Sequence, residues 1–247
     1  PANIAGVEAC RKVMPEVPMV LVFDTAFHQT MAPEAYLYAI PYEYYTDYKI
    51  RKYGFHGTSH LFVSQEAAKV LGKTPEEVKI ITCHIGNGGS CAAVEYGKCI
   101  DTSMGLTPID GLVMGTRCGD IDPSVVTYLM SKLNVSADEV LNILNKKSGL
   151  LGISGVSNDC RLVEGAAAEG NERADLAMKM FVRRVKGYVG NYLAQLNGAD
   201  ALVFTAGIGE NDPTVRADIC EGLTNLGFKI DPEKNKVRGE EAIISTD

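Results

Sequence analysis

Short apolar runs alternate with longer amphipathic stretches along most of the chain. Continuous apolar or β-branched runs, typical of buried strands, lie at residues 19–23, 78–85, 91–96 and 201–206. Apolar residues recur at helical spacing over residues 6–14, 61–72, 137–147, 172–197 and 215–226. Strands that alternate with helices predict an α/β domain.

Local signals predict where two of these helices begin or end. Ser136 followed by Glu139 is a capping box, in which each residue accepts a hydrogen bond from the other's backbone N–H. Thr58 or Ser59 is expected to cap the helix that runs to Gly72, its glycine stop.

Two segments interrupted by glycines, 101–123 and 150–161, show neither a strand pattern nor helical spacing and are expected to be irregular. Long loops in a compact domain are usually functional. Arg117 stands between Gly115 and Gly119, so small neighbours would let its guanidinium reach over a phosphate or carboxylate. An exposed surface arginine is the alternative.

The apolar run 78–85 leads into Gly86-Asn87-Gly88-Gly89-Ser90, and a second strand, 91–96, leaves at once. This pattern predicts a β-hairpin whose tip carries little side chain. Glycines let a ligand approach the backbone, and successive N–H groups form an anion-binding nest. A plain tight turn explains the tip equally well, because Asn-Gly is common in hairpin turns.

Two polar residues stand where predicted elements end or begin. Asp24 follows the apolar run 19–23, at the edge where open α/β sheets bind ligands, although a cap or turn role explains it as well. His56 precedes the helix 61–72, beside unpaired N–H groups and the positive end of the helix dipole. That position predicts an anion site.

The apolar run 201–206 is followed by Gly207-Ile208-Gly209 and, after Asp212-Pro213, by a helix. Strand, glycine turn and capped helix together are typical of a nucleotide phosphate or ribose site. A bare Gly-x-Gly is a weak signal by itself.

Composition narrows the classes of partner. The 247 residues carry a net charge of −7, and no segment looks like a signal peptide or membrane span. The acidic balance, with a pI near 5.2, disfavours nucleic acid and membrane surfaces. Seven scattered cysteines, none in a Cys-x-x-Cys pair, favour a reduced cytoplasmic protein.

Several segments together, in order and over essentially the whole chain, closely resemble the acetate kinase family: 22–28, 51–60, 82–90, 114–119, 157–159 and 204–211. The resemblance implies the fold shared by sugar kinases, actin and chaperone ATPases, an α/β ribonuclease H-like domain with a mixed sheet flanked by helices. It also implies reversible in-line phosphoryl transfer from ATP to acetate with Mg²⁺, giving acetyl phosphate and ADP.

The resemblance assigns roles only to matching residues. It implies catalysis by Asp24, His56 and Arg117, with Asp24 holding Mg²⁺ directly or through water. It implies phosphate binding by His84, Gly86, Asn87 and Gly88. Phosphoryl transfer depends on such positioning and electrostatic stabilisation.

The resemblance also implies a nucleotide site and a substrate pocket. Nucleotide binding is implied for Asp159, Arg161, Gly207, Ile208 and Asn211, and walls around the acetate methyl for Phe55 and Pro108. Cys160 departs from the family, because an aromatic residue is expected there beside the adenine.

The family pattern also implies an incomplete protein. Residues 1–24 would be the remnant of an N-terminal domain, and residues 25–247 a nucleotide-binding and dimerisation domain that is incomplete at its C-terminus. A first phosphate loop, a second arginine and a histidine are expected before Pro1, and a metal-linked glutamate and a helix after Asp247. We therefore expect this chain alone to be inactive.

Other functions remain open. A propionate or butyrate kinase would share these motifs, and a non-catalytic nucleotide-binding or dimerisation module would share the fold. A homodimer through the region 172–197 is plausible. His56 and His60, four residues apart, are an alternative metal pair, and with His84 they would suit a zinc hydrolase.

Overall fold

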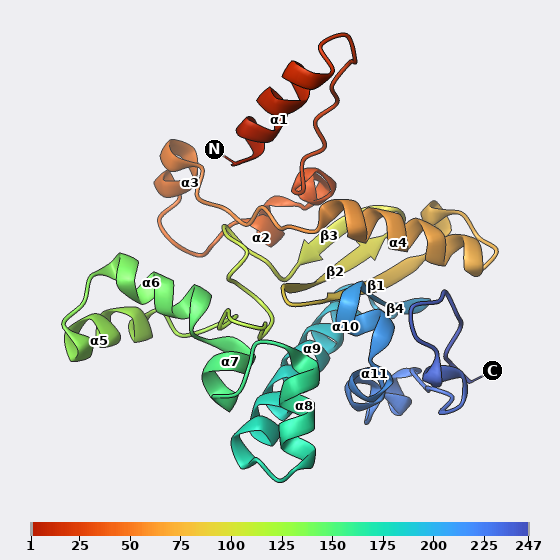
Figure 1. The fold of residues 1–247 in the computed structure, drawn as a ribbon. Helices are drawn as coiled ribbons and strands as arrows, with labels where there is room; N and C mark the ends of the chain where they lie inside the picture. Colours follow the sequence, from red (N-terminus) through yellow and green to blue (C-terminus); the bar gives the residue numbers. More distant parts are fainter. Residues whose placement is uncertain (1, 247) are drawn as a thin grey trace.

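The computed structural model describes residues 2–246 and is built around one mixed sheet of order β3-β2-β1-β4 (Figure 1). Its strands are β1 (Lys79–Ile85), β2 (Gly89–Glu95), β3 (Lys98–Thr102) and β4 (Ala201–Thr205). β2 pairs antiparallel with both β1 and β3, whereas β4 runs parallel to β1. The expected mixed sheet and the expected hairpin are confirmed.

Alternate residues of β1 enter two separate cores on the two faces of the sheet. Ile81 and Cys83 join the larger core with the long helix α9 (Glu172–Gln195), and Ile80 joins the smaller core with Ala68 of α4 (Gly57–Val70). Figure 1 shows α4 above the sheet and α9 below it. Because both faces are covered, β1 is apolar throughout most of its length.

Shorter helices surround this frame. Packed around α9 and β4 are α7 (Gly149–Ser154), α8 (Cys160–Ala168), α10 (Ala206–Asn211) and α11 (Pro213–Cys220). The remaining α-helices are α1 (Ala2–Val13), α2 (Pro33–Tyr36), α3 (Glu43–Tyr48), α5 (Ser124–Leu133) and α6 (Ala137–Lys146). Single 3₁₀ turns occupy Ala26–Thr30, Pro75–Glu77, Thr224–Leu226 and Lys234–Lys236.

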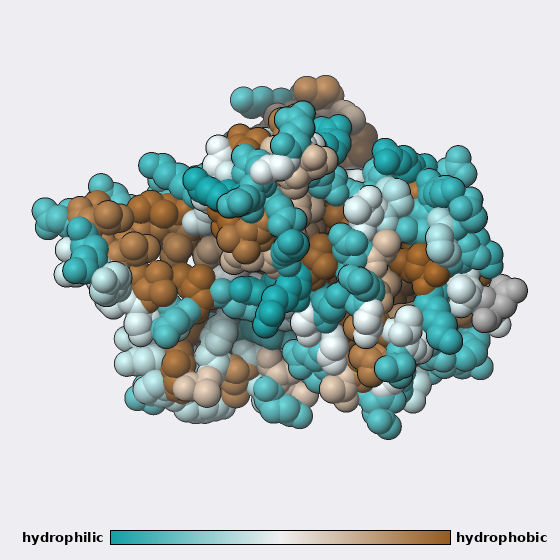
Figure 2. Space-filling view, turned by 90° about the horizontal axis from the view of Figure 1, so that it is seen from below, coloured by the Kyte–Doolittle hydropathy of each residue, from teal (hydrophilic) through white to brown (hydrophobic). Residues whose placement is uncertain are grey.

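Apolar side chains remain exposed at the end of the molecule formed by α5 and α6, which is the brown region at the left of Figure 2. Tyr128, Leu133 and Leu141 are between 50% and 63% exposed there. α6 is tied down by buried Val140 and by the predicted capping box of Ser136. Exposed apolar surface of this kind is typical of an interaction surface.

The expected strand at 19–23 is wrong. No described strand lies beside this segment, and Val20 and Phe23 are 84% and 66% exposed. A β-strand needs a neighbour to pair its backbone N–H and C=O groups, and β3 and β4 are the sheet's edges. The apolar run indicated strand propensity but did not supply a partner.

Two local expectations also need correction. Residues 150–161 are not all loop, because α7 begins at Gly149, with φ of +63°, and ends against Gly155, with φ of +70°. The sequence did not predict this helix, because glycine has a low helix propensity. The N-cap of α4 is His56, with φ of +56°, and not Thr58 or Ser59.

No described helix is both long and apolar enough to cross a membrane. Residues 1 and 247, the outer limits of the two predicted domains, lie outside the described residues.

Candidate active site

The site is built on the tip of the β1–β2 hairpin, where His84 lies directly opposite Ser90. Gly86 donates its backbone N–H to Gly88 O over 3.0 Å and so closes the turn. This amide is engaged within the loop, so the tip is a turn as well as a candidate anion site. Gly88 is half-buried and is bordered by side chains from two other segments.

Arg117 and His56 converge on Gly88 from segments that lie on either side of it in the sequence. A Cβ atom added at Gly88 would lie 3.3 Å from Arg117 Nη1 and 3.9 Å from His56 Nε2. Arg117 Nη1 also donates to Pro108 O over 3.3 Å, which aims the guanidinium across the tip. The absent side chain at residue 88 therefore leaves a small space between a cation and an imidazole nitrogen.

Asp24 anchors the start of α4 beside this space. His56 donates its backbone N–H to Asp24 Oδ2 over 2.9 Å, and Gly57 donates its own to Asp24 O over 2.8 Å. A Cβ at Gly57 would collide with Asp24 O, so close approach requires glycine here. Asp24 and His56, which lie 32 positions apart in the sequence, are thus in direct contact.

The rings of His56 and His84 are stacked, and both are neutral near pH 7. Burial, and then His84, lower the pKa of His56 to about 4, and burial lowers the pKa of His84 as well. Ser59 Oγ holds His84 Nδ1 at 2.8 Å. Arg117 therefore supplies the positive charge at Gly88, and His56 is a neutral ring.

Asn87 joins the hairpin tip to two loops. Its backbone O accepts from Gly115 N over 2.9 Å, and its Oδ1 accepts from Asn158 Nδ2 over 3.1 Å. A Cβ at Gly115 would collide with Asn87 Oδ1 and approach Asn158 O to 2.9 Å. Gly115 is therefore needed for close packing rather than for a special φ value.

The predicted nucleotide residues lie in two groups. Gly207, Ile208 and Asn211 belong to α10, whose start is close to the hairpin tip: a Cβ at Gly86 would be 4.0 Å from Gly207 N. Asn211 Nδ2 donates to Gly207 O over 3.0 Å. Glu210, which sequence reasoning missed, accepts from Ala206 N over 3.0 Å and caps the start of α10.

Asp159 and Arg161 form the second group and bond to each other. Asp159 caps α8 by accepting from Arg161 N over 3.0 Å, and it also accepts from Arg161 Nε over 3.0 Å. Their link to the hairpin tip is the neighbouring Asn158. The expected aromatic position, Cys160, is buried, with Sγ 3.8 Å from Met178 Sδ.

Phe55 and Pro108, the predicted walls of the substrate pocket, are each connected to a residue of the site. Phe55 O accepts from His28 Nε2 over 2.8 Å and directly precedes His56, while Pro108 O is the acceptor for Arg117. Both residues are partly exposed. Phe55 is thus joined to the Gly88 space through the chain to His56, and Pro108 through its hydrogen bond with Arg117.

Asp24 suits a Mg²⁺ ion, directly or through water. Its side chain is exposed and has a second carboxylate oxygen besides the one that accepts from His56, and hard oxygen ligands with retained water are what Mg²⁺ prefers. The histidine alternative does not suit a metal, because both nitrogens of His60 are engaged by hydroxyls, Nδ1 by Thr82 Oγ1 and Nε2 by Ser90 Oγ, each at 2.7 Å. His60 therefore has no ring nitrogen free for the alternative metal pair with His56.

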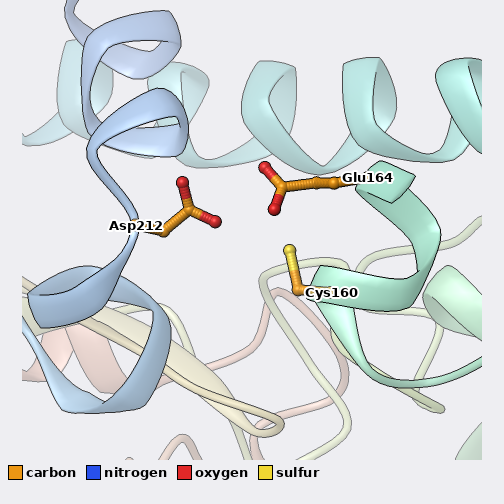
Figure 3. Close-up of side chains that lie close together, drawn as sticks. All are labelled: Cys160, Glu164 and Asp212. Carbon is orange, nitrogen blue, oxygen red and sulfur yellow. The ribbon is translucent and has the colours of Figure 1, made fainter. Parts of the chain in front are cut away.

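Within residues 2–246, one group of three potential metal ligands lies close together: Cys160 and Glu164 of α8, and Asp212 before α11 (Figure 3). Asp212 already caps α11 by accepting from Val215 N over 3.0 Å. Burial and Asp212 raise the pKa of Glu164 to about 7, and burial raises that of the Cys160 thiol. Partial protonation of Glu164 near pH 7 reduces the repulsion between its carboxyl group and that of Asp212.

The sequence analysis also did not identify the two hydroxyl groups that bond to His60. Thr82 and Ser90 are fully buried, and each bonds to His60. Thr82 and His84 are two residues apart on β1 and so face the same side, toward α4. That pair of polar residues within an apolar strand was the available signal.

The whole described frame has close counterparts among known proteins. Over residues 1–247 the chain matches the model of the acetokinase family. It is 66% identical to an acetate kinase of Thermoanaerobacterium thermosaccharolyticum, covering 100% of this chain and 62% of that protein. It is 62% identical to an acetate kinase of Treponema denticola, over 97% of this chain and 60% of that one.

Two solved structures have the same architecture. The acetate kinase of Porphyromonas gingivalis superposes with a TM-score of 0.96 at 49% identity, over 100% of this chain and 62% of that chain. A propionate kinase of Francisella tularensis superposes with a TM-score of 0.92 at 50% identity, over 100% of this chain and 66% of that chain. The expected α/β fold of the actin-like and sugar-kinase type is confirmed.

The matched relatives and solved structures are thus acetate and propionate kinases that share this architecture. The chain belongs to the acetokinase family. It spans 62% of the length of the first of its curated relatives.

Proposed function

We propose that this chain works within a longer protein of its relatives' length, here called the full-length protein, as the larger part of an acetate kinase. The reaction is reversible in-line transfer of a phosphoryl group from ATP to acetate, giving acetyl phosphate and ADP. The observation that carries this proposal is the convergence of Arg117 and His56 on Gly88 at a glycine-rich hairpin tip. Phosphoryl transfer needs just such positioned donors around three equatorial oxygens.

The roles of the residues follow from their chemistry. Arg117 provides the charge, and its fork can bind two phosphoryl oxygens at once. His56 donates one hydrogen bond from Nε2, and the stacked His84 keeps the His56 ring in place. Asn87 and the backbone N–H of Gly88 bind phosphate oxygens at the tip, and Gly86 shapes the turn by donating its own N–H to Gly88 O.

Mg²⁺ is the metal that we propose for this site, with Asp24 as its protein ligand or the acceptor for its water. When bound, the ion neutralises phosphate charge. Asp24 also fixes the first turn of α4, because it accepts from the backbone N–H groups of His56 and Gly57 and so connects the metal position with the backbone that carries the imidazole. ATP binding is assigned to Gly207, Ile208 and Asn211, together with Asp159 and Arg161.

Acetate is the acyl substrate that we propose, with Phe55 and Pro108 beside its methyl group. The matched propionate kinase supports propionate as a second candidate, and butyrate is the next homologue. One methylene is worth only about 1–3 kcal/mol in discrimination. Measuring kcat/KM for acetate, propionate and butyrate in the full-length protein separates these three.

Assembly and location complete the proposal. We propose a cytoplasmic protein without nucleic-acid or membrane partners, and all seven cysteines are free, as is usual in that compartment. We also propose a homodimer, because α9 exposes Leu176 (50%) and Met180 (39%). A hollow of about 620 Å³ along α9, lined in part by Arg183, supports a contact there. Sedimentation velocity on the chain tests this dimer.

We further propose that residues 1–24 belong to a neighbouring domain and residues 25–247 to the nucleotide-binding and dimerisation domain. The exposure of Val20 and Phe23 supports a surface that another domain covers. On this proposal the 247-residue chain binds nucleotide weakly and does not turn over. A purely nucleotide-binding module remains the alternative from a different class.

The test compares the chain with the full-length protein. Acetate, ATP and hydroxylamine should give acetyl hydroxamate with the full-length protein and none with the chain. If the full-length protein binds ATP but forms no hydroxamate from any of the three acids, the binding module replaces the kinase. If the chain alone reaches the full-length rate, the domain proposal is overturned.

A further inference from the structure

A line of buried hydrogen bonds leads from His56 into the interior. His56 Nδ1 is 2.8 Å from Ser90 Oγ, and the same oxygen is 2.7 Å from His60 Nε2. His60 Nδ1 is in turn 2.7 Å from Thr82 Oγ1. Ser90, His60 and Thr82 are each 0% exposed, and the proposed chemistry leaves all three without a role.

Counting protons gives this line a direction. An anion at Gly88 needs an N–H at His56 Nε2, so a neutral His56 must present a lone pair at Nδ1. Ser90 must then donate its single hydroxyl proton to that lone pair. Consequently, Ser90 Oγ has to accept its other bond from His60 Nε2–H.

The same count extends to the inner end. A neutral His60 that donates from Nε2 has its lone pair at Nδ1, which must accept from the Thr82 hydroxyl. Thr82 Oγ1 has Ala92 O as an alternative acceptor, but at 3.4 Å against 2.7 Å for His60. Reversing all three bonds would leave His56 Nε2 with a lone pair, which would repel an anion.

We propose that His60, acting through Ser90 and supported by Thr82, is a positioning residue that fixes His56 as an Nε2–H donor toward a phosphate oxygen at Gly88. The proposal rests on the proposed function, because it is the phosphate that requires a donor there. It gives the buried face of α4 a role beyond packing, since His60 touches neither substrate nor metal.

The test reads the His56 tautomer directly by ¹⁵N NMR of histidine-labelled chain, with and without inorganic phosphate. In the native chain with phosphate, His56 should show one tautomer, with the proton on Nε2. His60→Leu removes the donor to Ser90, so the hydroxyl becomes free to donate or accept, and a mixture of both tautomers should appear. His60→Gln keeps an amide donor near the Nε2 position and should restore the single tautomer.

A second variant guards against loss of folding and isolates the connection. Ser90→Ala removes only the linking hydroxyl and should produce the same tautomer mixture. If His60 acts through Ser90, adding His60→Leu to Ser90→Ala should leave the His56 signals unchanged. In the full-length protein, His60→Leu should lower kcat by up to about 10²-fold with little change in KM.

The outcomes separate the two proposals. If neither His60→Leu nor Ser90→Ala changes the His56 tautomer, with or without phosphate, the positioning role is overturned. If both variants shift the tautomer but phosphate moves no His56 signal in the native chain, the relay stands and the phosphate site at Gly88 is wrong.

Discussion

His56 and His84 stack face to face, with ring centroids 4.0 Å apart and planes inclined by 19°. The two rings belong to different elements, one at the start of α4 and one near the end of β1. Two imidazolium ions at this distance would repel each other, so the stack favours neutral rings. The charge that faces Gly88 therefore belongs to Arg117, and the imidazoles contribute hydrogen bonds and shape.

Arg117→Gln should lower kcat/KM for acetate kinase activity in the full-length protein by about 10²–10³-fold, because it removes a cation from the phosphoryl group. Thermal stability should change little, since the contacts that Gln would lose are a 3.3 Å bond from the guanidinium to Pro108 O and a 3.6 Å contact to Met114 Sδ. The hydroxamate assay and thermal unfolding measure the two effects. The matched control Arg11→Gln, on exposed α1, should alter neither.

Gly115→Ala should destabilise the chain by about 1–3 kcal/mol, because its methyl group would collide with Asn87 Oδ1. Urea unfolding measures the difference. Gly165→Ala is the control: it lies within α8 with nothing within 4 Å of the new methyl group, and it should stabilise by about 0.5–1 kcal/mol. Equal effects at both positions would mean that residue 115 is not packed against Asn87.

Glu164 should make stability depend on pH. Its pKa is raised in the folded state from 4.5 to about 7, so folding favours the protonated form. Its contribution is fully present below the unfolded pKa, declines as pH rises, and is lost above about pH 7. After allowing for the solvent that reaches this half-buried group, Glu164→Gln should stabilise the chain by about 1 kcal/mol near pH 8.

The check is the free energy of unfolding of both proteins at several pH values. The difference between them should shrink toward zero as pH falls below the unfolded pKa of the carboxyl group. If the two curves stay parallel across this range, the pKa of Glu164 is not raised by folding.

Asp24→Asn should weaken the Mg²⁺ dependence of the full-length protein while preserving the fold. The amide oxygen can still accept from His56 N, but the negative charge that favours Mg²⁺ is gone. A titration of rate against Mg²⁺ should therefore reach half-saturation at a higher concentration. An unchanged titration would remove Asp24 from the metal site.

Local patterns were sufficient to predict the hairpin, because strand propensity and the glycine turn both act within residues 78–96. The capping box at Ser136 was predictable for the same reason. The segment 19–23 was not, because strand formation depends on a neighbour that propensity does not reveal. In the same way, α7 was missed because its stability comes from burial of Leu150 rather than from helix propensity.

The candidate site shows the same difference between residues that local patterns identify and residues whose role depends on distant contacts. Gly88 and Arg117 stood out by residue type, and their spatial convergence followed from resemblance. Ser90 and Thr82 were overlooked because their importance comes from contacts with His60 across 30 and 22 residues. Such contacts are set by how α4 lies on the sheet.

The central claim, that the transferred phosphoryl group lies over Gly88 between Arg117 and His56, is tested most directly by Gly88→Ala in the full-length protein. The methyl group would occupy that space, 3.3 Å from Arg117 Nη1 and 3.9 Å from His56 Nε2. We predict that the rate of acetyl hydroxamate formation falls steeply while the melting temperature stays near that of the native protein. A Gly88→Ala protein that works at the native rate would contradict the account.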